Sequence, residues 1–347
     1  MAAAPEGVLD TAGMWDVAEA FPEQVEQAAS ASNALIGLPP HDEIENVVVL
    51  GMGGSGIAGD IMTAVAGPFM PVPIVVTKGY EPPSFVGPST LCFALSFSGN
   101  TEETIEAAQT AALAGSRMVV IAKGGELARL AQTWDATLIG LPDGIPYPRA
   151  GLGAMSIPTL LVLEQIGLFP GASGWVGLAV EQLKMRRDRL FKEDNEAREL
   201  ARQIGRSLPI IYGGGGLGAA AALRWKNEMN ENPKVPAFMH AVPELMHNEI
   251  AGWGQHGDVT RQVFSLVLLR HDHEHPQIMR RFDLIRQWTD EAVGRIEEVH
   301  AEGDGPLAQV FDLMFFGTMV SLHMAAQEGV DPGPVAVLEE IKAALAE

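Results

Sequence analysis

Hydrophobic residues in the first half of the chain form short continuous runs, separated by stretches with helical periodicity. Continuous runs are typical of parallel strands that are buried on both faces. They predict strands at residues 46–50, 73–76, 90–95, 117–121 and 136–139, with helices between most of them, and a closing helix at 152–166. Strands that alternate with helices indicate an α/β fold with a doubly wound parallel sheet.

The second half of the chain begins like the first. A strand at residues 47–50 leads into the glycine run 51–56, and a strand at 208–212 leads into the glycine run 213–218. Both runs open a small-residue helix, and they are offset by 162 residues (213 minus 51). This repeat predicts two copies of one fold.

The two copies are separated by a Gly/Pro-rich linker at residues 167–174, which is typical of a connection between domains. A long charged helix is predicted after it, at residues 175–204. We therefore expect a first domain at 1–170, including a leading helical segment, and a second at 171–347, which ends in a terminal helix.

Composition favours an ordinary soluble chain. It has 347 residues, of which 47% are hydrophobic, and no apolar run reaches the length of a membrane-spanning helix. The N-terminal residues lack the basic segment and apolar core of a signal peptide. The single cysteine, Cys92, lies within a predicted strand, which favours a small buried hydrophobic residue over a nucleophile. We expect a cytoplasmic protein that does not bind membranes.

Net charge restricts the ligands. The formal charge is −21, so no basic face is available to neutralise a nucleic-acid backbone, and a nucleic-acid partner is not expected. The same charge opposes long-range attraction of anionic substrates. A phosphorylated ligand would have to be held by short-range dipoles and an arginine.

The segment 96–104 offers such dipoles. It follows the strand at 90–95 and opens a predicted helix at 105–113, so Ser96, Ser98 and Thr101 lie near a helix N-terminus. Unpaired N–H groups and the positive end of the helix dipole meet there. A phosphate could bind at this position without a lysine.

Two other interpretations compete with a phosphate site. Asn100 or Thr101 would cap the helix, with Glu103 closing a capping box on Asn100. In addition, both glycine runs match the Gly-x-Gly-x-x-Gly pattern of dinucleotide sites. The strand after the first run ends in Thr77 and Lys78, where a dinucleotide fold needs an acidic residue. A nicotinamide cofactor is therefore not expected.

The second half carries candidate acid–base groups. Glu231 stands between two asparagines near the end of a helix that Pro233 stops, and His247 follows sixteen residues later. Each has an ordinary alternative, since Glu231 would be an exposed helix-end acid and His247 a packed histidine. Near a phosphate, however, a Glu and a His suit sugar chemistry, in which both ring-oxygen and carbon-bound protons move.

Three histidines, at positions 271, 273 and 275, suggest a metal site. Alternating side chains face one way only in a strand, and Pro276 follows at once, so a solvated loop is the favoured interpretation. No metal is expected.

In sequence, the chain resembles the bifunctional phosphoglucose/phosphomannose isomerases, which are built from two sugar-isomerase (SIS) domains. The resemblance runs from residue 13 to the terminal helix. It rests on five motifs in order: 51–56 (GMGGSG), 96–104 (SFSGNTEET), 148–150 (PRA), 230–232 (NEN) and 247–249 (HNE).

The resemblance implies a set of substrate contacts and catalytic roles. Gly54 and Ser55 would line the sugar site, while Ser96, Ser98 and Thr101 would hold the 6-phosphate. Arg149 would stabilise an enediolate, and Glu231 would be the base that moves a proton between C2 and C1. His247 would assist ring opening from the partner subunit of a homodimer, and Lys342 would lie near the ring oxygen.

The activity that these roles imply interconverts glucose 6-phosphate or mannose 6-phosphate with fructose 6-phosphate through a cis-enediol, without a cofactor. Residues 331–335 lack a threonine that the family often has there, so the preferred sugar is not implied. Alternatives are a non-catalytic SIS-type sugar-phosphate-binding protein and an NAD(P)-dependent dehydrogenase. Were Glu231 only structural, the base would be sought at Glu228 or Glu249.

Overall fold

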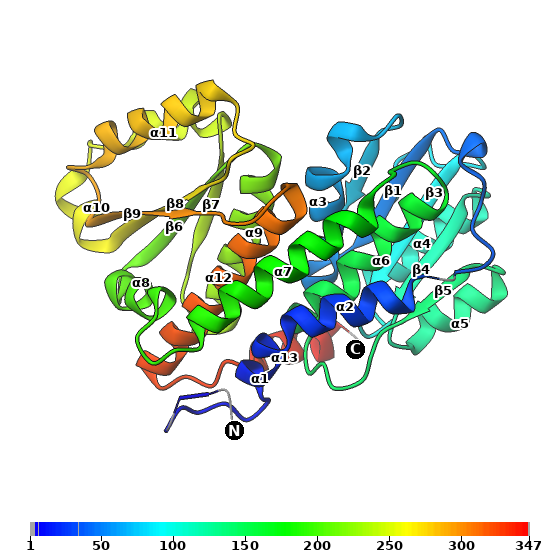
Figure 1. Ribbon diagram of the computed structural model, residues 1–347, viewed down its shortest axis with the longest axis horizontal. Coiled ribbons are helices and arrows are strands. Elements are labelled where there is room, and N and C mark those ends of the chain that lie inside the picture. The colour runs from blue at the N-terminus through cyan, green and yellow to red at the C-terminus, as the bar shows by residue number, and fades with distance from the viewer. Residues whose placement is uncertain (1–3, 6, 34, 346–347) are drawn as a thin grey trace.

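The computed structural model describes residues 4–5, 7–33 and 35–345, and contains two parallel sheets with helices packed around them (Figure 1). Residues 1–3 and 6, on which the signal-peptide expectation partly rests, lie outside these ranges. The first sheet has the order β2-β1-β3-β4-β5. Its strands are β1 (Asn46–Gly51), β2 (Ile74–Thr77), β3 (Thr90–Ser96), β4 (Arg117–Ala122) and β5 (Thr137–Gly140). All five strands were predicted to within one residue at each end.

The second sheet has the order β7-β6-β8-β9, and its strands are also parallel. They are β6 (Leu208–Gly214), β7 (Phe238–Val242), β8 (Phe264–Arg270) and β9 (Arg295–His300). The expected α/β class, with one parallel sheet in each half, is confirmed. The sheets lie on either side of the expected boundary at 170/171, which itself stays a prediction.

Helices cover both faces of the first sheet. The faces are packed by two separate hydrophobic clusters, one of which continues into the second half of the chain. In the first half the helices are α1 (Met14–Glu19), α2 (Phe21–Ala31), α3 (Gly53–Val65), α4 (Glu102–Leu113), α5 (Gly125–Thr133) and α6 (Leu152–Gln165). In the second they are α7 (Ala172–Leu190), α8 (Glu196–Ile204), α9 (Gly215–Glu231), α10 (Gly257–Val263), α11 (Pro276–Thr289), α12 (Pro306–Glu328) and α13 (Ala336–Leu345).

The internal repeat extends to the backbone conformation. Gly53 and Gly215, 162 residues apart, both have positive φ, at 49° and 60°. The strand and helix that each run joins also lie very close. A Cβ on Gly56 would lie 2.6 Å from the Gly51 oxygen, and one on Gly213 would lie 1.9 Å from the Gly218 oxygen. Glycine is needed at positions 56 and 213, because any side chain there would push the helix away from the strand.

The single long helix predicted at 175–204 is wrong. The chain forms α7 and α8 instead, with residues 191–195 between them. Asn195 has an extended backbone (φ −135°, ψ 159°), and its side chain accepts a hydrogen bond from the Arg198 N–H at 2.9 Å. This N-cap starts a second helix and explains the interruption.

The 23-residue helix α12 lies in the core. By length and composition it could cross a membrane, but 94% of its apolar window is buried within the protein, where it packs against α7, α8 and α9. Cys92 is also fully buried, and burial raises the pKa of its thiol to about 12. The interpretation of Cys92 as a packed hydrophobic residue is confirmed.

His323 is a buried histidine on α12. Its ring packs edge-on against Trp15 of α1, with ring centres 4.8 Å apart. Burial lowers the pKa of His323 to about 4, and the charge of Arg198 acts in the same direction. The unfolded chain therefore binds a proton at higher pH than the folded chain does, which makes acid destabilising.

Replacing His323 with Gln should make stability less dependent on pH. As pH falls from about 6.5 to about 4, wild type should lose up to about 3 kcal/mol more unfolding free energy than His323→Gln does. Urea unfolding at several pH values measures this difference. Parallel stability curves for the two proteins would contradict the assignment.

Candidate active site

The two glycine- and hydroxyl-rich segments of the first half meet at one edge of the first sheet. In the order β2-β1-β3, the chain winds in opposite directions on either side of the gap between β1 and β3. Ligands of open parallel sheets bind at such a switch point, beyond the carboxyl ends of the strands. The glycine run follows β1 there, and the segment 96–101 follows β3.

The turn after β3 is built from its own hydroxyl groups. The Ser96 hydroxyl oxygen accepts a hydrogen bond from the Gly99 N–H at 3.0 Å and lies 2.8 Å from the Thr101 hydroxyl. Ser98 is exposed, and its hydroxyl oxygen accepts from the Asn100 N–H at 3.2 Å. Three hydroxyl groups thus gather at the start of α4.

The N-terminus of α4 has no side-chain cap. Thr101 occupies the cap position, but its side chain makes no capping hydrogen bond. The Asn100 side chain instead accepts from the Glu126 N–H at 3.0 Å, so the alternative in which Asn100 or Thr101 caps the helix is wrong. The helix also begins at Glu102, three residues earlier than predicted. Its first-turn N–H groups are left for another acceptor.

A second loop, which sequence reasoning missed, supports this turn. The Lys123 N–H donates to the Phe97 oxygen at 3.0 Å, and the Leu127 N–H donates to the Gly99 oxygen at 2.9 Å. Gly99 has a φ of +75°, and a Cβ there would lie 1.7 Å from the Gly124 oxygen. The adjacent glycines at 124 and 125 were the available sequence signal.

Close contacts continue from this turn toward the second half. The Ser55 hydroxyl, in the first turn of α3, accepts from the Phe97 N–H at 3.0 Å. Its neighbour Gly54 lies against the short helix η3 (Pro148–Gly151), where a Cβ would be 2.9 Å from the Arg149 nitrogen. Gly54, Ser55 and the hydroxyl turn are therefore parts of one surface.

Arg149 joins the two halves. Its guanidinium is buried, with 4% of the side chain exposed. Nε donates to the Asn232 side-chain oxygen at 2.9 Å, and Nη1 lies 3.3 Å from a Glu231 oxygen. Nη2 donates to the oxygens of Pro332 and Gly333 at 2.5 and 2.6 Å. These bonds use four of the five guanidinium N–H groups.

Glu231, the last residue of α9, is partly accessible, with 27% of its side chain exposed. Burial raises its pKa, Arg149 opposes that shift, and Glu228 reinforces it. The alternative base Glu228 is fully buried and is paired with Arg224 and with the Asn232 amide, the latter at 2.5 Å. Glu231 is thus the carboxylate of this group that a ligand can reach.

The segment before α13 forms a further wall beside Arg149. A Cβ on Gly333 would lie 2.6 Å from the Ala12 Cβ, so a larger side chain has no room there without movement. Lys234 also reaches the segment, donating to the oxygens of Asn232 (3.1 Å) and Asp331 (2.5 Å). Sequence reasoning missed Lys234, although it directly follows the Asn-Glu-Asn-Pro stretch.

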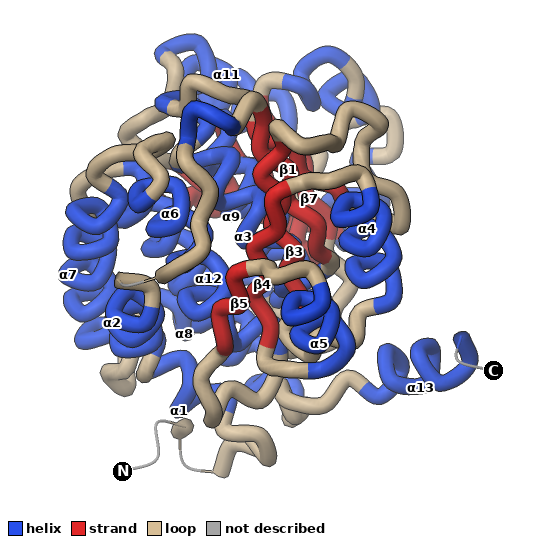
Figure 2. Tube along the Cα trace, turned by 90° about the vertical axis from the view of Figure 1, so that its right-hand side faces the viewer, coloured by secondary structure: helices blue, strands red, loops and turns tan. Residues whose placement is uncertain are grey.

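Two predicted site residues are not brought into this group. His247 ends the short helix η4 (Glu244–His247) and is exposed. Lys342 lies on α13, where its ammonium pairs with Glu339 at 2.8 Å. Figure 2 shows α13 standing away from the body of the subunit.

The corresponding switch point of the second half is filled. Beyond β8, His271 is buried, and its Nε2 lies 2.8 Å from the Gly214 oxygen. The backbone N–H of His271 donates to the Glu274 carboxylate at 3.1 Å. His275 caps α11, whereas His273 is exposed, so the three histidines lie in different environments. The segment is a loop, as expected, but it is not solvated throughout, because His271 and Glu274 are buried. Within 4–5, 7–33 and 35–345, no group of three or more His, Cys, Asp or Glu side chains could hold a metal.

Both halves match protein-family models. Residues 43–140 match the SIS domain, and residues 193–345 match the bacterial phospho-glucose isomerase C-terminal SIS domain. The chain is 32% identical to a bifunctional phosphoglucose/phosphomannose isomerase of Caldicellulosiruptor bescii, over 94% of this chain and 97% of the relative. The chain belongs to this family. A relative with the same name, from Thermoplasma acidophilum, is 30% identical, over 86% and 88% of the two chains.

The same fold recurs in a solved structure. The C-terminal domain of glucosamine-fructose-6-phosphate aminotransferase from Francisella tularensis superimposes with a TM-score of 0.71 at 17% identity, covering 92% of this chain and 98% of that one. At this identity the likeness concerns fold alone. The resemblance to bifunctional phosphoglucose/phosphomannose isomerases, and the SIS fold that it implied, are confirmed.

Replacing Arg149 with Lys should destabilise the junction between the halves. Lysine cannot span four acceptors, and the buried oxygens that it leaves unpaired should cost about 2–4 kcal/mol. Chemical unfolding measures the loss. Arg129→Lys is the matched control, because Arg129 pairs with Glu126 on the surface. This substitution should change the free energy of unfolding by less than about 0.5 kcal/mol. Equal effects of the two substitutions would contradict the role of Arg149.

Proposed function

We propose that this protein is a sugar-phosphate isomerase that interconverts glucose 6-phosphate or mannose 6-phosphate with fructose 6-phosphate. The observation that carries the proposal is the unbroken series of contacts from the uncapped N-terminus of α4, through Ser55 and Gly54, to Arg149 and Glu231. These contacts connect the proposed anion site to the proposed carboxylate base. The names of the relatives support the same activity.

In this proposal, the phosphate occupies the start of α4. The first-turn N–H groups and the helix dipole attract the anion, and Ser96, Ser98 and Thr101 supply hydroxyl groups. Such dipoles act over a short range, which suits a chain with a net charge of −21.

Glu231 is the proposed base at the other end of the sugar. A carboxylate with a raised pKa is a stronger base than an ordinary one, so it is better suited to moving a proton between C2 and C1. Among the residues that the structure describes, one guanidinium N–H of Arg149 has no partner, and it belongs to Nη1, the nitrogen beside Glu231. It would stabilise the developing enediolate oxygen.

Ring opening is assigned to His247 and Lys342, neither of which meets Glu231 within one subunit. We propose a cytoplasmic homodimer in which His247 reaches the partner's site. The exposure of His247 supports this arrangement, because a side chain directed to solvent is free to enter another subunit.

Two alternatives remain testable. A non-catalytic SIS-type sugar-phosphate-binding protein would need the α4 site but no base with a raised pKa. An NAD(P)-dependent dehydrogenase would need an acidic residue after β2, where Lys78 instead pairs with Asp60 of α3 at 2.5 Å. Both alternatives therefore fit the site less well.

A coupled assay on glucose, mannose and fructose 6-phosphates tests the proposal directly. We expect turnover of at least one aldose without added metal or nicotinamide in the isomerisation step. Binding of these sugars without turnover would favour the non-catalytic alternative, and NADH binding seen by protein fluorescence would favour the dehydrogenase.

Removing the phosphate-facing hydroxyls should weaken substrate binding. Each lost hydrogen bond to a charged group costs about 1.5–3 kcal/mol, so the Ser98→Ala/Thr101→Val double variant should raise KM at least about tenfold. Initial rates over a range of 6-phosphosugar concentrations measure KM. Thr110→Val, at the exposed far end of α4, should leave KM unchanged. An unchanged KM in the double variant would place the phosphate elsewhere.

Removing the base should slow turnover strongly while leaving substrate binding nearly unchanged. Glu231→Gln keeps the shape of the side chain and should lower kcat by about 10²–10⁴-fold, the range typical of a lost general base. Solvent-deuterium incorporation at C1/C2 of the product should fall in parallel. The acid limb of the wild-type pH–rate profile should lie above the ordinary pKa of glutamate, because burial raises the pKa of Glu231. Near-normal turnover in Glu231→Gln would rule it out as the base.

A further inference from the structure

His247 lies between two anchored residues. Two positions before it, the side chain of Leu245 is fully buried in the hydrophobic cluster of the second half. Two positions after it, Glu249 begins the short helix η5 (Glu249–Gly252) and points back to the second sheet. An exposed side chain is therefore carried by a backbone that is held on both sides.

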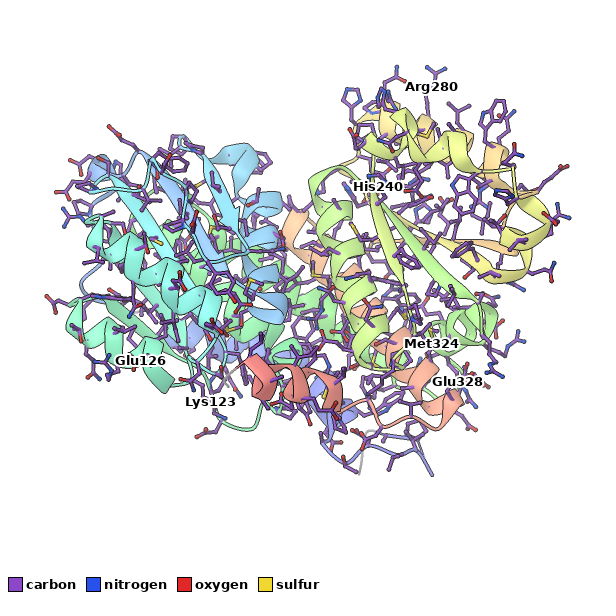
Figure 3. The ribbon with its side chains drawn as sticks, turned by 180° about the vertical axis from the view of Figure 1, so that it is seen from behind. Lys123, Glu126, His240, Arg280, Met324 and Glu328 are labelled. Atoms are coloured by element: carbon purple, nitrogen blue, oxygen red, sulfur yellow. The ribbon has the colours of Figure 1, made fainter. Side chains whose placement is uncertain are left out.

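The Glu249 carboxylate is shared between two strands. One oxygen accepts the Tyr212 hydroxyl of β6, and the other lies 2.7 Å from Nδ1 of His240 on the edge strand β7. Tyr212 and His240 are direct neighbours in the sheet register, and His240 is labelled in Figure 3. Trp253 extends the cluster by donating from Nε1 to the Tyr212 oxygen at 3.2 Å.

Asn248 connects His247 to this cluster. Its side-chain oxygen accepts the Glu249 N–H at 2.6 Å, and its amide donates to Glu244 at 3.0 Å. The residues on either side of His247 are thus tied to each other and to the sheet. The imidazole of His247 makes no hydrogen bond or ion pair within the part of the chain that the structure describes.

We propose that Glu249 is a positioning residue for His247, which sets the direction in which the imidazole leaves the subunit to enter the partner's active site. The proposal rests on the proposed function, in which His247 assists ring opening across a homodimer. A misplacement of about 1 Å can cost a rate factor of about 10².

Replacing Glu249 with Gln tests whether both carboxylate oxygens are needed to hold the segment that carries His247. Gln keeps the size of the side chain but replaces one carboxylate oxygen with an amide NH2, which donates, so Tyr212 and His240 can no longer both donate to the two positions that the Glu249 oxygens occupy. Glu249→Gln should lower kcat about 10- to 100-fold on cyclic sugar phosphate, with KM little changed. Glu244→Gln is the matched control, because it makes the same chemical change on the same segment and its remaining oxygen can still accept from the Asn248 amide.

A double variant distinguishes positioning from general destabilisation. If Glu249 acts through His247, then Glu249→Gln should cause no further loss of kcat in a His247→Ala background. An equal loss in both backgrounds, or no loss in wild type, would overturn the proposal. Absence of isomerase activity in wild type would instead overturn the proposed function, so the two failures are distinguishable.

Mixed dimers test the route across the interface. Glu231→Gln and Glu249→Gln subunits are each impaired, but one of the two sites in a mixed dimer combines an intact Glu231 with a correctly held His247. Random mixing should restore about one quarter of wild-type activity, because half of the dimers are mixed and each has one intact site. No recovery, with both variants folded, would overturn the proposal, because a defect confined to its own subunit cannot be complemented.

Discussion

The buried guanidinium of Arg149 is the interaction on which the arrangement of the two halves depends. It comes from the first half, yet its partners are the end of α9 and the segment before α13. A buried cation is costly unless its donors are paired, so the acceptors must stay where they are. This requirement brings Glu231 to the edge of the first sheet. The proposed base and the proposed anion site are thus connected through Arg149, although 130 residues separate Thr101 from Glu231 in the sequence (231 minus 101).

Duplication of the fold produced one open site and one filled site. Both halves keep the strand, glycine run and helix, with positive φ at Gly53 and Gly215. In the first half, the neighbouring strand ends in a hydroxyl turn before an uncapped helix. In the second half, the corresponding position holds His271 and the Glu274 carboxylate. The Glu274 carboxylate, which is paired with Arg270, already accepts the His271 backbone N–H, so that donor is not free for a phosphate. The second half contributes Glu231, the proposed base, to the candidate site of the first.

Sequence patterns predicted the parts of the fold that depend on local chemistry. Buried parallel strands are continuous apolar runs, so all five strands of the first sheet could be found, and so could the uncommon hydroxyl turn at 96–101. The break between α7 and α8 was missed because a single N-cap, Asn195, produces it. The support of Gly99 by the loop at 124–125, and the contacts of Arg149 with residues 332 and 333, could not be predicted. They join segments distant in sequence, and the adjacent glycines at 124 and 125 mark only the supporting loop, not the turn that it supports.

The protein's acidity explains why its site is built from dipoles and one buried arginine. With a net charge of −21, the chain offers many carboxylates that can pair with an exposed cation in place of an anionic ligand. Exposed arginines such as Arg129 and Arg202 are indeed paired with neighbouring glutamates. Arg149 is shielded from such exchange because its partners are fixed oxygens of the protein. Its charge therefore acts on the group beside it rather than on distant ligands. That group is Glu231, where burial raises the pKa and Arg149 limits the rise. One residue thus holds the two halves together and keeps the proposed base ionisable.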